Sequence, residues 1–158
     1  TILPLNKDAF DVHDVDYAAT DFQGLNWIIE HCGLPRLDDF CWIATQESNV
    51  YGGLAVALPF IHSRPRYFGE IIAELLFWIG PEKILFGSDY AIWTPKWLVE
   101  KLWAYQIPED ISAERGGVQL TDEIKEKILG LNAARLYNID VAARKAEFAA
   151  QPISLAAE

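Results

Sequence analysis

The sequence predicts an α/β protein built around a parallel sheet of three strands. Short apolar runs suited to buried strands alternate along the chain with longer segments whose apolar residues recur at helical spacing. The clearest run is residues 83–88, KILFGS, which needs no polar alternation because a parallel strand is covered on both faces. Alternating strands and helices form right-handed βαβ units. Three such strands leave two bare edges, so we expect further strands from elsewhere.

The first part of the chain predicts two helices and two strands. Asp11 can cap a helix that ends at Gly24. Residues 25–30, LNWIIE, have the β-branched and aromatic content of a strand. A helix follows over residues 35–45, and residues 49–58 form the second strand, although a glycine pair weakens that assignment. The first helix has four apolar residues that share one face: Val12, Val15, Ala19 and Phe22.

Residues 66–79 form the strongest predicted helix, ended by a Gly-Pro pair before the third strand. Thr94, followed by a proline, opens a helix over residues 96–105. We expect residues 106–120, which contain one proline and two glycines, to form an exposed connection. The helix over residues 66–79 has one apolar stripe: Phe68, Ile71, Ile72, Leu75, Leu76 and Ile79.

The last part of the chain predicts short helices. Thr121 caps a helix that Gly130 breaks near residue 129, and Asn132 can cap another that reaches Tyr137. Residues 141–149 form a terminal helix, and residues 151–158 are a tail. The first ten residues read as a loop entered from something upstream.

Composition limits the classes of partner and compartment. The chain has 158 residues, enough for one domain with a sizeable core, and 51% of them are hydrophobic. A formal charge of −10 argues against nucleic acid or an anionic membrane as partner. There is no apolar run of about 18 residues, so we expect a soluble, cytoplasmic protein. Its two cysteines, Cys32 and Cys41, are expected to be reduced core residues.

Asp89 is the first candidate site residue. It follows Gly87 and Ser88 directly where the third strand ends, and ligands of α/β proteins collect at the carboxyl ends of strands. The alternative is that Asp89 only caps the next turn.

Three segments together carry a family resemblance: WIIEHCGLPRLDD (residues 27–39), EIIAELLFWIGPEKILFGSDY (70–90) and LTDEIKEKILGLNAARLYNI (120–139). They resemble the amidohydrolase superfamily, in particular the amidohydrolase-related branch that includes aminocarboxymuconate-semialdehyde decarboxylase. The most specific piece is FGSDY after a helix, followed downstream by NAARL. The likeness covers residues 1–140 and leaves residues 141–158 as a C-terminal helix and tail.

The resemblance implies a (β/α)8 TIM barrel with a divalent metal, zinc or else manganese or iron, at its C-terminal face. Such a barrel takes about 250 residues, so this chain would supply strands 6–8, the C-terminal part. An N-terminal half-barrel, from another chain or a missing upstream segment, would complete it, and we expect an oligomer. The resemblance implies that His31 corresponds to the family's strand-6 histidine. It also implies that Asp89 corresponds to the strand-8 aspartate, which in the family binds the metal or handles a proton of the metal-bound water.

Barrel interiors are filled in layers by alternate strands, so residues on strands 6 and 8 can enter one layer. An imidazole nitrogen and a carboxylate oxygen suit zinc, although a catalytic zinc site uses about three protein ligands. The H-x-H pair of strand 1 and a strand-5 ligand are missing from this sequence. The alternative for His31 is a half-buried histidine bonded to nearby backbone.

Two further residues are candidates for binding a small-molecule substrate. Arg64 can hold a substrate carboxylate through a bidentate fork, or be an ordinary surface arginine. Trp93 can wall a pocket or simply pack. The resemblance implies an enzyme, either a metal-dependent hydrolase or a non-oxidative decarboxylase (a lyase). The alternative function is a non-catalytic accessory or scaffold subunit on a degenerate half-barrel.

Overall fold

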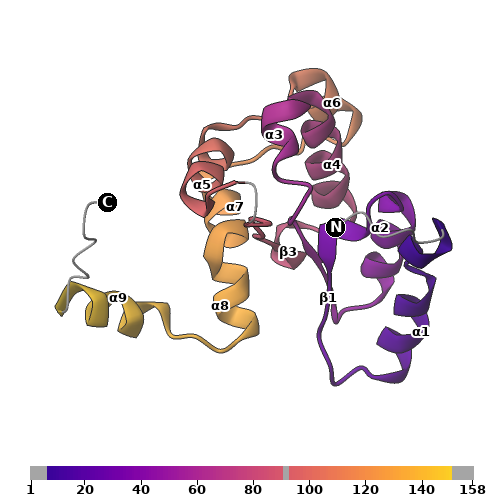
Figure 1. Ribbon diagram of the computed structural model, residues 1–158, viewed down its shortest axis with the longest axis horizontal. Helices are drawn as coiled ribbons and strands as arrows, with labels where there is room; N and C mark the ends of the chain where they lie inside the picture. Colours follow the sequence, from indigo (N-terminus) through magenta and orange to yellow (C-terminus); the bar gives the residue numbers. More distant parts are fainter. Residues whose placement is uncertain (1–6, 91–92, 151–158) are drawn as a thin grey trace.

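The computed structural model describes residues 7–90 and 93–150, so the predicted tail over residues 151–158 lies outside the described residues. No described helix is long and apolar enough to cross a membrane. In Figure 1 the helices follow one another around the sheet, from α1 and α2 beside β1 to α5, α7 and α8 on the side of β3. The elements are, in order, η1 (Lys7–Phe10), α1 (His13–Asp21), β1 (Trp27–Ile29), η2 (Glu30–Gly33), α2 (Leu37–Gln46), β2 (Val50–Gly53), α3 (Phe60–Ser63), α4 (Pro65–Trp78), η3 (Pro81–Lys83), β3 (Ile84–Leu85), α5 (Pro95–Ala104), α6 (Glu109–Glu114), α7 (Asp122–Glu126), the π-helical turn η4 (Lys127–Leu131), α8 (Asn132–Leu136) and α9 (Val141–Ala150).

The three strands form one parallel sheet in the order β1-β2-β3, which confirms the predicted three-stranded parallel sheet. Ile28 of β1 pairs with Tyr51 of β2, and Gly53 of β2 pairs with Leu85 of β3. Each strand is shorter than predicted: the second ends at Gly53, and residues 54–58 turn away toward α3. The sheet and its covering helices fit part of a (β/α)8 barrel.

The glycine pair in β2 weakened the strand assignment from the sequence, but in the structure these glycines allow close packing. A Cβ at Gly52 would stand 3.0 Å from Cζ of Phe40, so the ring of this buried α2 residue lies directly against the strand. Successive residues of a strand face opposite sides of the sheet. Gly53 therefore faces away from α2, and this second face matters for the candidate site.

Helix α4 confirms the strongest helix prediction almost residue for residue. Five residues of the predicted stripe are buried, and Ile79 is the C-cap residue. The Thr94 hydroxyl accepts a hydrogen bond from the backbone N–H of Trp97, and the Thr121 hydroxyl accepts one from Ile124. Both threonines are therefore the N-caps that the sequence predicted.

Four predicted details are wrong. Phe22 is exposed rather than on the inner face of α1. The expected exposed connection over residues 106–120 contains α6 and buries Ile111 in the core. Gly130 does not end the helical segment, because α7 continues through the π-helical turn η4 into α8. Asn132 is buried and caps no helix; its Nδ2 instead donates to the carbonyl oxygens of Pro81 and Ile84.

The outer edge of β3 is not bare, contrary to expectation. The Leu54 N–H donates to the Leu85 carbonyl at 2.9 Å, so the backbone groups of Leu85 point toward β2. The backbone groups of its neighbours Ile84 and Phe86 therefore point toward the outer edge of the sheet. The outward carbonyl of Ile84 accepts from Asn132 at 2.8 Å, and the outward N–H of Phe86 donates to the Ile128 carbonyl at 3.0 Å. The η4–α8 segment thus covers the edge of β3, whereas β1 pairs with β2 alone among the described strands.

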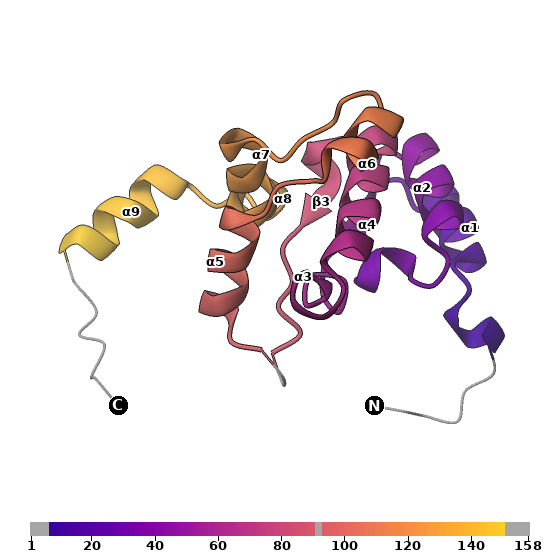
Figure 2. The same ribbon diagram turned by 90° about the horizontal axis from the view of Figure 1, so that it is seen from above.

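Helix α9 confirms the predicted terminal helix and stands apart from the rest of the molecule. Both views show it projecting beyond α8 at the end of a short linker (Figures 1 and 2). None of its ten residues is buried. Its contact with the rest of the described chain is a shallow pocket that Val141 and Lys145 line with residues of α5, α7 and η4.

Candidate functional site

Backbone strain collects at the carboxyl edge of the sheet. Non-glycine residues with left-handed backbone follow each of the three strands: His31 (φ 60°) after β1, Val56 (φ 59°) after β2 and Asp89 (φ 50°) after β3. Such a residue costs on the order of 1 kcal/mol, most clearly for the β-branched Val56. This edge is also where ligands of parallel α/β proteins bind, so it is the candidate functional site.

The predicted residues His31 and Asp89 both lie at this edge. The half-buried His31 comes two residues after β1, and the exposed Asp89 comes four residues after β3. Because β1 and β3 are parallel neighbours of β2, the two side chains start from the same edge with one strand between them.

A carboxylate that sequence reasoning missed lies between them. A Cβ on Gly53 would stand 3.0 Å from Oε2 of Glu30, so the carboxylate of Glu30 lies against the end of β2. It occupies the face opposite Phe40, the face that α2 leaves free. The available signal was its place beside His31 at the end of a strand.

Cys32 is part of the edge but belongs to the core. Its buried Sγ donates to the Gly53 carbonyl at 3.3 Å. Burial, then the neighbouring Cys41 and Glu30, raises the pKa of the Cys32 thiol far above its usual range. Burial, with Glu74 and Asp38, raises the pKa of Cys41 to about 12. Both are free thiols, as predicted, and neither has the thiolate character that a metal ligand needs.

The loops after β2 and β3 touch closely at Gly87. A Cβ at Gly87 would stand 2.7 Å from the backbone nitrogen of Ala55 and 3.0 Å from its Cβ. No side chain fits there unless the backbone moves. This glycine therefore fixes the path of the chain two residues before Asp89.

The predicted substrate residues lie in the connections that lead from β2 to α4 and from β3 to α5. Arg64, between α3 and α4, places its guanidinium carbon 4.2 Å from the centre of the Tyr67 ring. Trp93 stacks on Trp97 with ring centres 5.1 Å apart. His62 of α3 joins the two connections, since its ring lies 5.2 Å from Trp93. His62 is not among the site residues predicted from the sequence.

The site on this chain is incomplete as a metal site. Among residues 7–90 and 93–150, no group of three or more His, Cys, Asp or Glu side chains is arranged to hold a metal ion. His31 and Asp89 supply one nitrogen and one oxygen donor, which suits zinc but falls short of about three protein ligands. The described residues are therefore compatible with part of a zinc site, and the remaining ligands would have to come from another part of the assembled protein.

The fold and its edge define an α/β protein with ionisable residues at the carboxyl ends of parallel strands. A profile of the amidohydrolase family matches residues 1–139. The chain belongs to the amidohydrolase family. No curated protein sequence matches it significantly.

Two solved structures are similar in fold. Both are crystal structures of an amidohydrolase from Burkholderia multivorans, one with bound HEPES and one with bound zinc. Each is 17% identical to this chain and covers 82% of it, with TM-scores of 0.57 and 0.55. The match takes in 50% and 49% of those chains, so this chain spans about half the length of the structures it matches.

Proposed function

We propose that this chain supplies part of the active site of a metal-dependent hydrolase or non-oxidative decarboxylase of the amidohydrolase type. In this proposal β1, β2 and β3 correspond to strands 6, 7 and 8 of a (β/α)8 barrel. The observation that carries it is the position of His31 and Asp89, which leave the same edge of one parallel sheet with left-handed backbone. Strain kept at two ionisable residues is typical of functional sites.

The proposed cofactor is a divalent ion, zinc in the first place, with manganese or iron as alternatives. His31 would hold it through an imidazole nitrogen and Asp89 through a carboxylate oxygen. When bound, such an ion polarises a carbonyl or carboxylate group and makes water more acidic. The remaining ligands would come from an N-terminal half-barrel, supplied by another chain or by an upstream segment.

The other side chains at the edge have roles that follow from their contacts. In the proposal the exposed Asp89 has the role that the family resemblance implies, a ligand of the ion that also handles a proton of its water. Glu30 follows β1, and because its carboxylate lies against Gly53 of β2 it provides a second carboxylate at this edge. In the proposal Arg64 binds a substrate carboxylate, and Trp93 forms one wall with its stacked partner Trp97.

A non-catalytic accessory subunit is the second candidate. It is favoured by one observation: the described residues hold no complete set of metal ligands. The two functions differ in what the assembled protein contains. An enzyme needs an H-x-H pair in the complementary half and a bound ion, whereas an accessory subunit needs neither.

The decisive experiment is the substitution Asp89→Asn in the assembled barrel, with both halves present. Asparagine keeps the size of the side chain and suits a turn cap, but it removes the charge that a cation requires. We expect metal per barrel, measured by elemental analysis, and turnover to fall together while the thermal melt is unchanged. Asp122→Asn, at an exposed first-turn position of α7, is the matched control. Full metal occupancy in Asp89→Asn would overturn the ligand assignment.

A further inference from the structure

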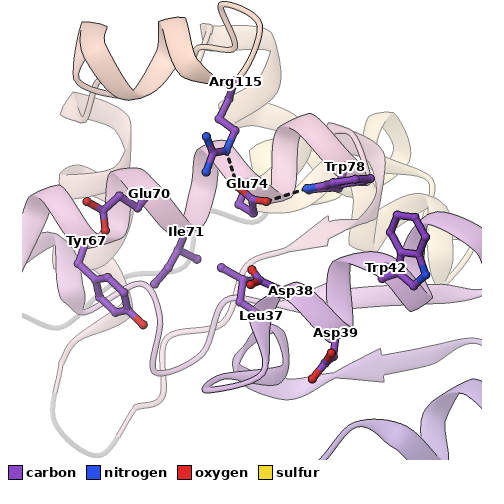
Figure 3. A pocket seen from close by; sticks show the side chains of 10 residues that line it. All are labelled: Leu37, Asp38, Asp39, Trp42, Tyr67, Glu70, Ile71, Glu74, Trp78 and Arg115. Carbon is purple, nitrogen blue, oxygen red and sulfur yellow. Dashed lines mark hydrogen bonds and ion pairs between the residues drawn. The ribbon is translucent and has the colours of Figure 1, made fainter.

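A second feature of the chain lies away from the sheet edge: a groove of about 620 Å³ along the outside of α2 and α4 (Figure 3). Both helices supply carboxylates to it, Asp38 and Asp39 from α2 and Glu70 and Glu74 from α4. Trp42 and Trp78 stand at one end with ring centres 5.5 Å apart. The groove therefore has an aromatic end and acidic walls on both sides.

The charges in the groove are only partly compensated. Arg115 is the cation among the lining residues, and it is paired with Glu74, which also accepts from Nε1 of Trp78. Asp39 is 4.0 Å from Arg36, and Glu70 is 3.7 Å from Arg66, so both pairs are long. The charge of Asp38, after those of Glu74 and Glu114, also raises the pKa of Arg115, so this one guanidinium serves several carboxylates. A ligand that carries positive charge on both sides would complement this groove.

Helix α9 has the complementary surface. Val141 and Phe148 are seven residues apart and share one face of the helix. Arg144 and Lys145 lie between them in sequence and flank that face, one on each side, because each residue turns the helix by about 100°. Phe148 is 57% exposed, whereas Val141 is half-buried and, with Lys145, borders a shallow pocket of its own chain beside Trp103. The result is an apolar stripe with a cation on each side; Arg144 also pairs with Glu147 of the same helix at 2.7 Å, whereas Lys145 forms no ion pair with a described residue.

The lengths also agree. Ten residues of α9 span about 15 Å, close to the length of α2 and shorter than that of α4. A helix that lays an apolar face into a groove between two helices is a common mode of recognition. In that arrangement Phe148 would meet the tryptophan end, and the two cations would meet carboxylates of opposite walls.

Helix α9 does not reach the groove of its own chain. In both views it projects from the side of α5 and α8, whereas α2 lies on the opposite side of the molecule (Figures 1 and 2). Only residues 137–140 join it to α8. The complementary surfaces therefore belong to one sequence but cannot meet within one folded copy.

We propose that helix α9 of one copy docks into the α2–α4 groove of a second copy of this chain. The contact joins two different surfaces, so it gives a reciprocal exchange between two copies, a closed ring or an open filament. It is independent of the metal site, because it uses the outer helices and not the carboxyl edge of the sheet. The exposed Phe148 and the open acidic groove are thereby both accounted for.

The first test is zero-length carbodiimide cross-linking in an equal mixture of 14N- and 15N-labelled protein, followed by mass spectrometry. The expected product is a mixed-isotope link between Lys145 and Asp38, Asp39, Glu70 or Glu74. Links found only within single-isotope pairs would mean that α9 stays on its own chain. Links from Lys145 to other surfaces, or none at all, would equally overturn the proposal.

The second test is charge reversal with rescue, followed by sedimentation. We expect R144E/K145E to weaken self-association at least tenfold, and a mixture with the D38K/D39K variant to restore it. The variant K96E/K101E makes the same charge change on α5 and is expected to leave association unchanged. All six positions are exposed, so circular dichroism should be unaltered. Association that survives R144E/K145E, or that the mixture fails to restore, would overturn the proposal.

Discussion

The side-chain amide of Asn49 donates to the carbonyl oxygen of Leu25 at 2.9 Å, across the turn between α1 and β1. The same nitrogen lies 3.2 Å from the Ala19 carbonyl and 3.3 Å from the Phe22 carbonyl. One buried amide therefore serves the end of α1 and the entry to β1 from its place before β2. The backbone adds to this link, since the Leu25 N–H donates to the Phe22 carbonyl at 3.0 Å and the Trp27 N–H donates to the Asn49 carbonyl at 2.8 Å.

Replacing Asn49 should consequently destabilise the protein. Asn49→Ala leaves three carbonyl groups without this donor, and we expect the free energy of unfolding to fall by about 2–4 kcal/mol. Chemical denaturation of the assembled protein measures the loss. The exposed neighbour Ser48→Ala serves as the control, with an expected change within about 0.5 kcal/mol. An equal effect of both substitutions would contradict the role given to Asn49.

Gly87 should tolerate no side chain. In Gly87→Ala the new Cβ meets the backbone of Ala55, so the loops after β2 and β3 must separate. We expect a loss of about 1–3 kcal/mol in stability and a displaced Asp89, with reduced metal occupancy. Gly24→Ala is the matched control, because nothing lies within 4 Å of its Cβ position. If thermal melts of the two variants coincide, the close approach does not constrain the site.

Asp89→Gly tests whether strain is retained for function. Glycine adopts the left-handed backbone without steric cost, so we expect a thermal stability equal to or higher than that of the wild type, by up to about 1 kcal/mol. Metal content should fall at the same time, because the carboxylate is gone. A clearly less stable Asp89→Gly variant would show that the side chain supports the fold instead.

Acid should selectively remove the contribution of Glu82. A hydrogen bond from Lys127 at 3.0 Å lowers the pKa of Glu82 below its ordinary value of 4.5. A lowered pKa in the folded state adds stability above pH 4.5, and this stability is lost as the pH falls through the folded-state pKa. We expect Glu82→Gln to be less stable than the wild type at pH 7 and equal to it near pH 2. Urea titrations across this range give the difference, and a gap that widens in acid would refute the assignment.

The chain purified alone should not sediment as a compact monomer. The outer edge of β1 pairs with no described strand, and large apolar side chains such as Trp42 and Phe148 are exposed. These surfaces favour association with a complementary half-barrel or with other copies. A cooperatively melting monomer of 17.8 kDa would contradict this expectation.

Sequence reasoning was most successful where periodicity and capping act locally. The stripe of α4 and the caps Thr94 and Thr121 are decided by residues within a few turns, and all were predicted. It failed where a distant contact decides. Asn132 looks like a cap, but Pro81 and Ile84, some fifty residues earlier in the chain, supply its partners.

The candidate site shows the same division. The position of Asp89 at a strand end was readable from FGSDY, whereas nothing in sequence spacing places Glu30 against Gly53 or His62 against Trp93. Those contacts exist only once strands and loops distant in sequence lie side by side. The helix α6 was missed for a related reason: Pro108 and the glycines Gly116 and Gly117 indicated a loop, while burial of Ile111 supports a helix.

The π-helical turn η4 protects the outer edge of β3 against aggregation. Its Ile128 carbonyl binds the outward N–H of Phe86, and the adjoining Asn132 binds the carbonyl of Ile84. An unprotected strand edge is a template for aggregation. Here the chain's own C-terminal segment occupies that template, so indiscriminate pairing at β3 is blocked. A genuine partner strand would have to exchange with the hydrogen bond at Phe86, which makes this edge selective while β1 stays open.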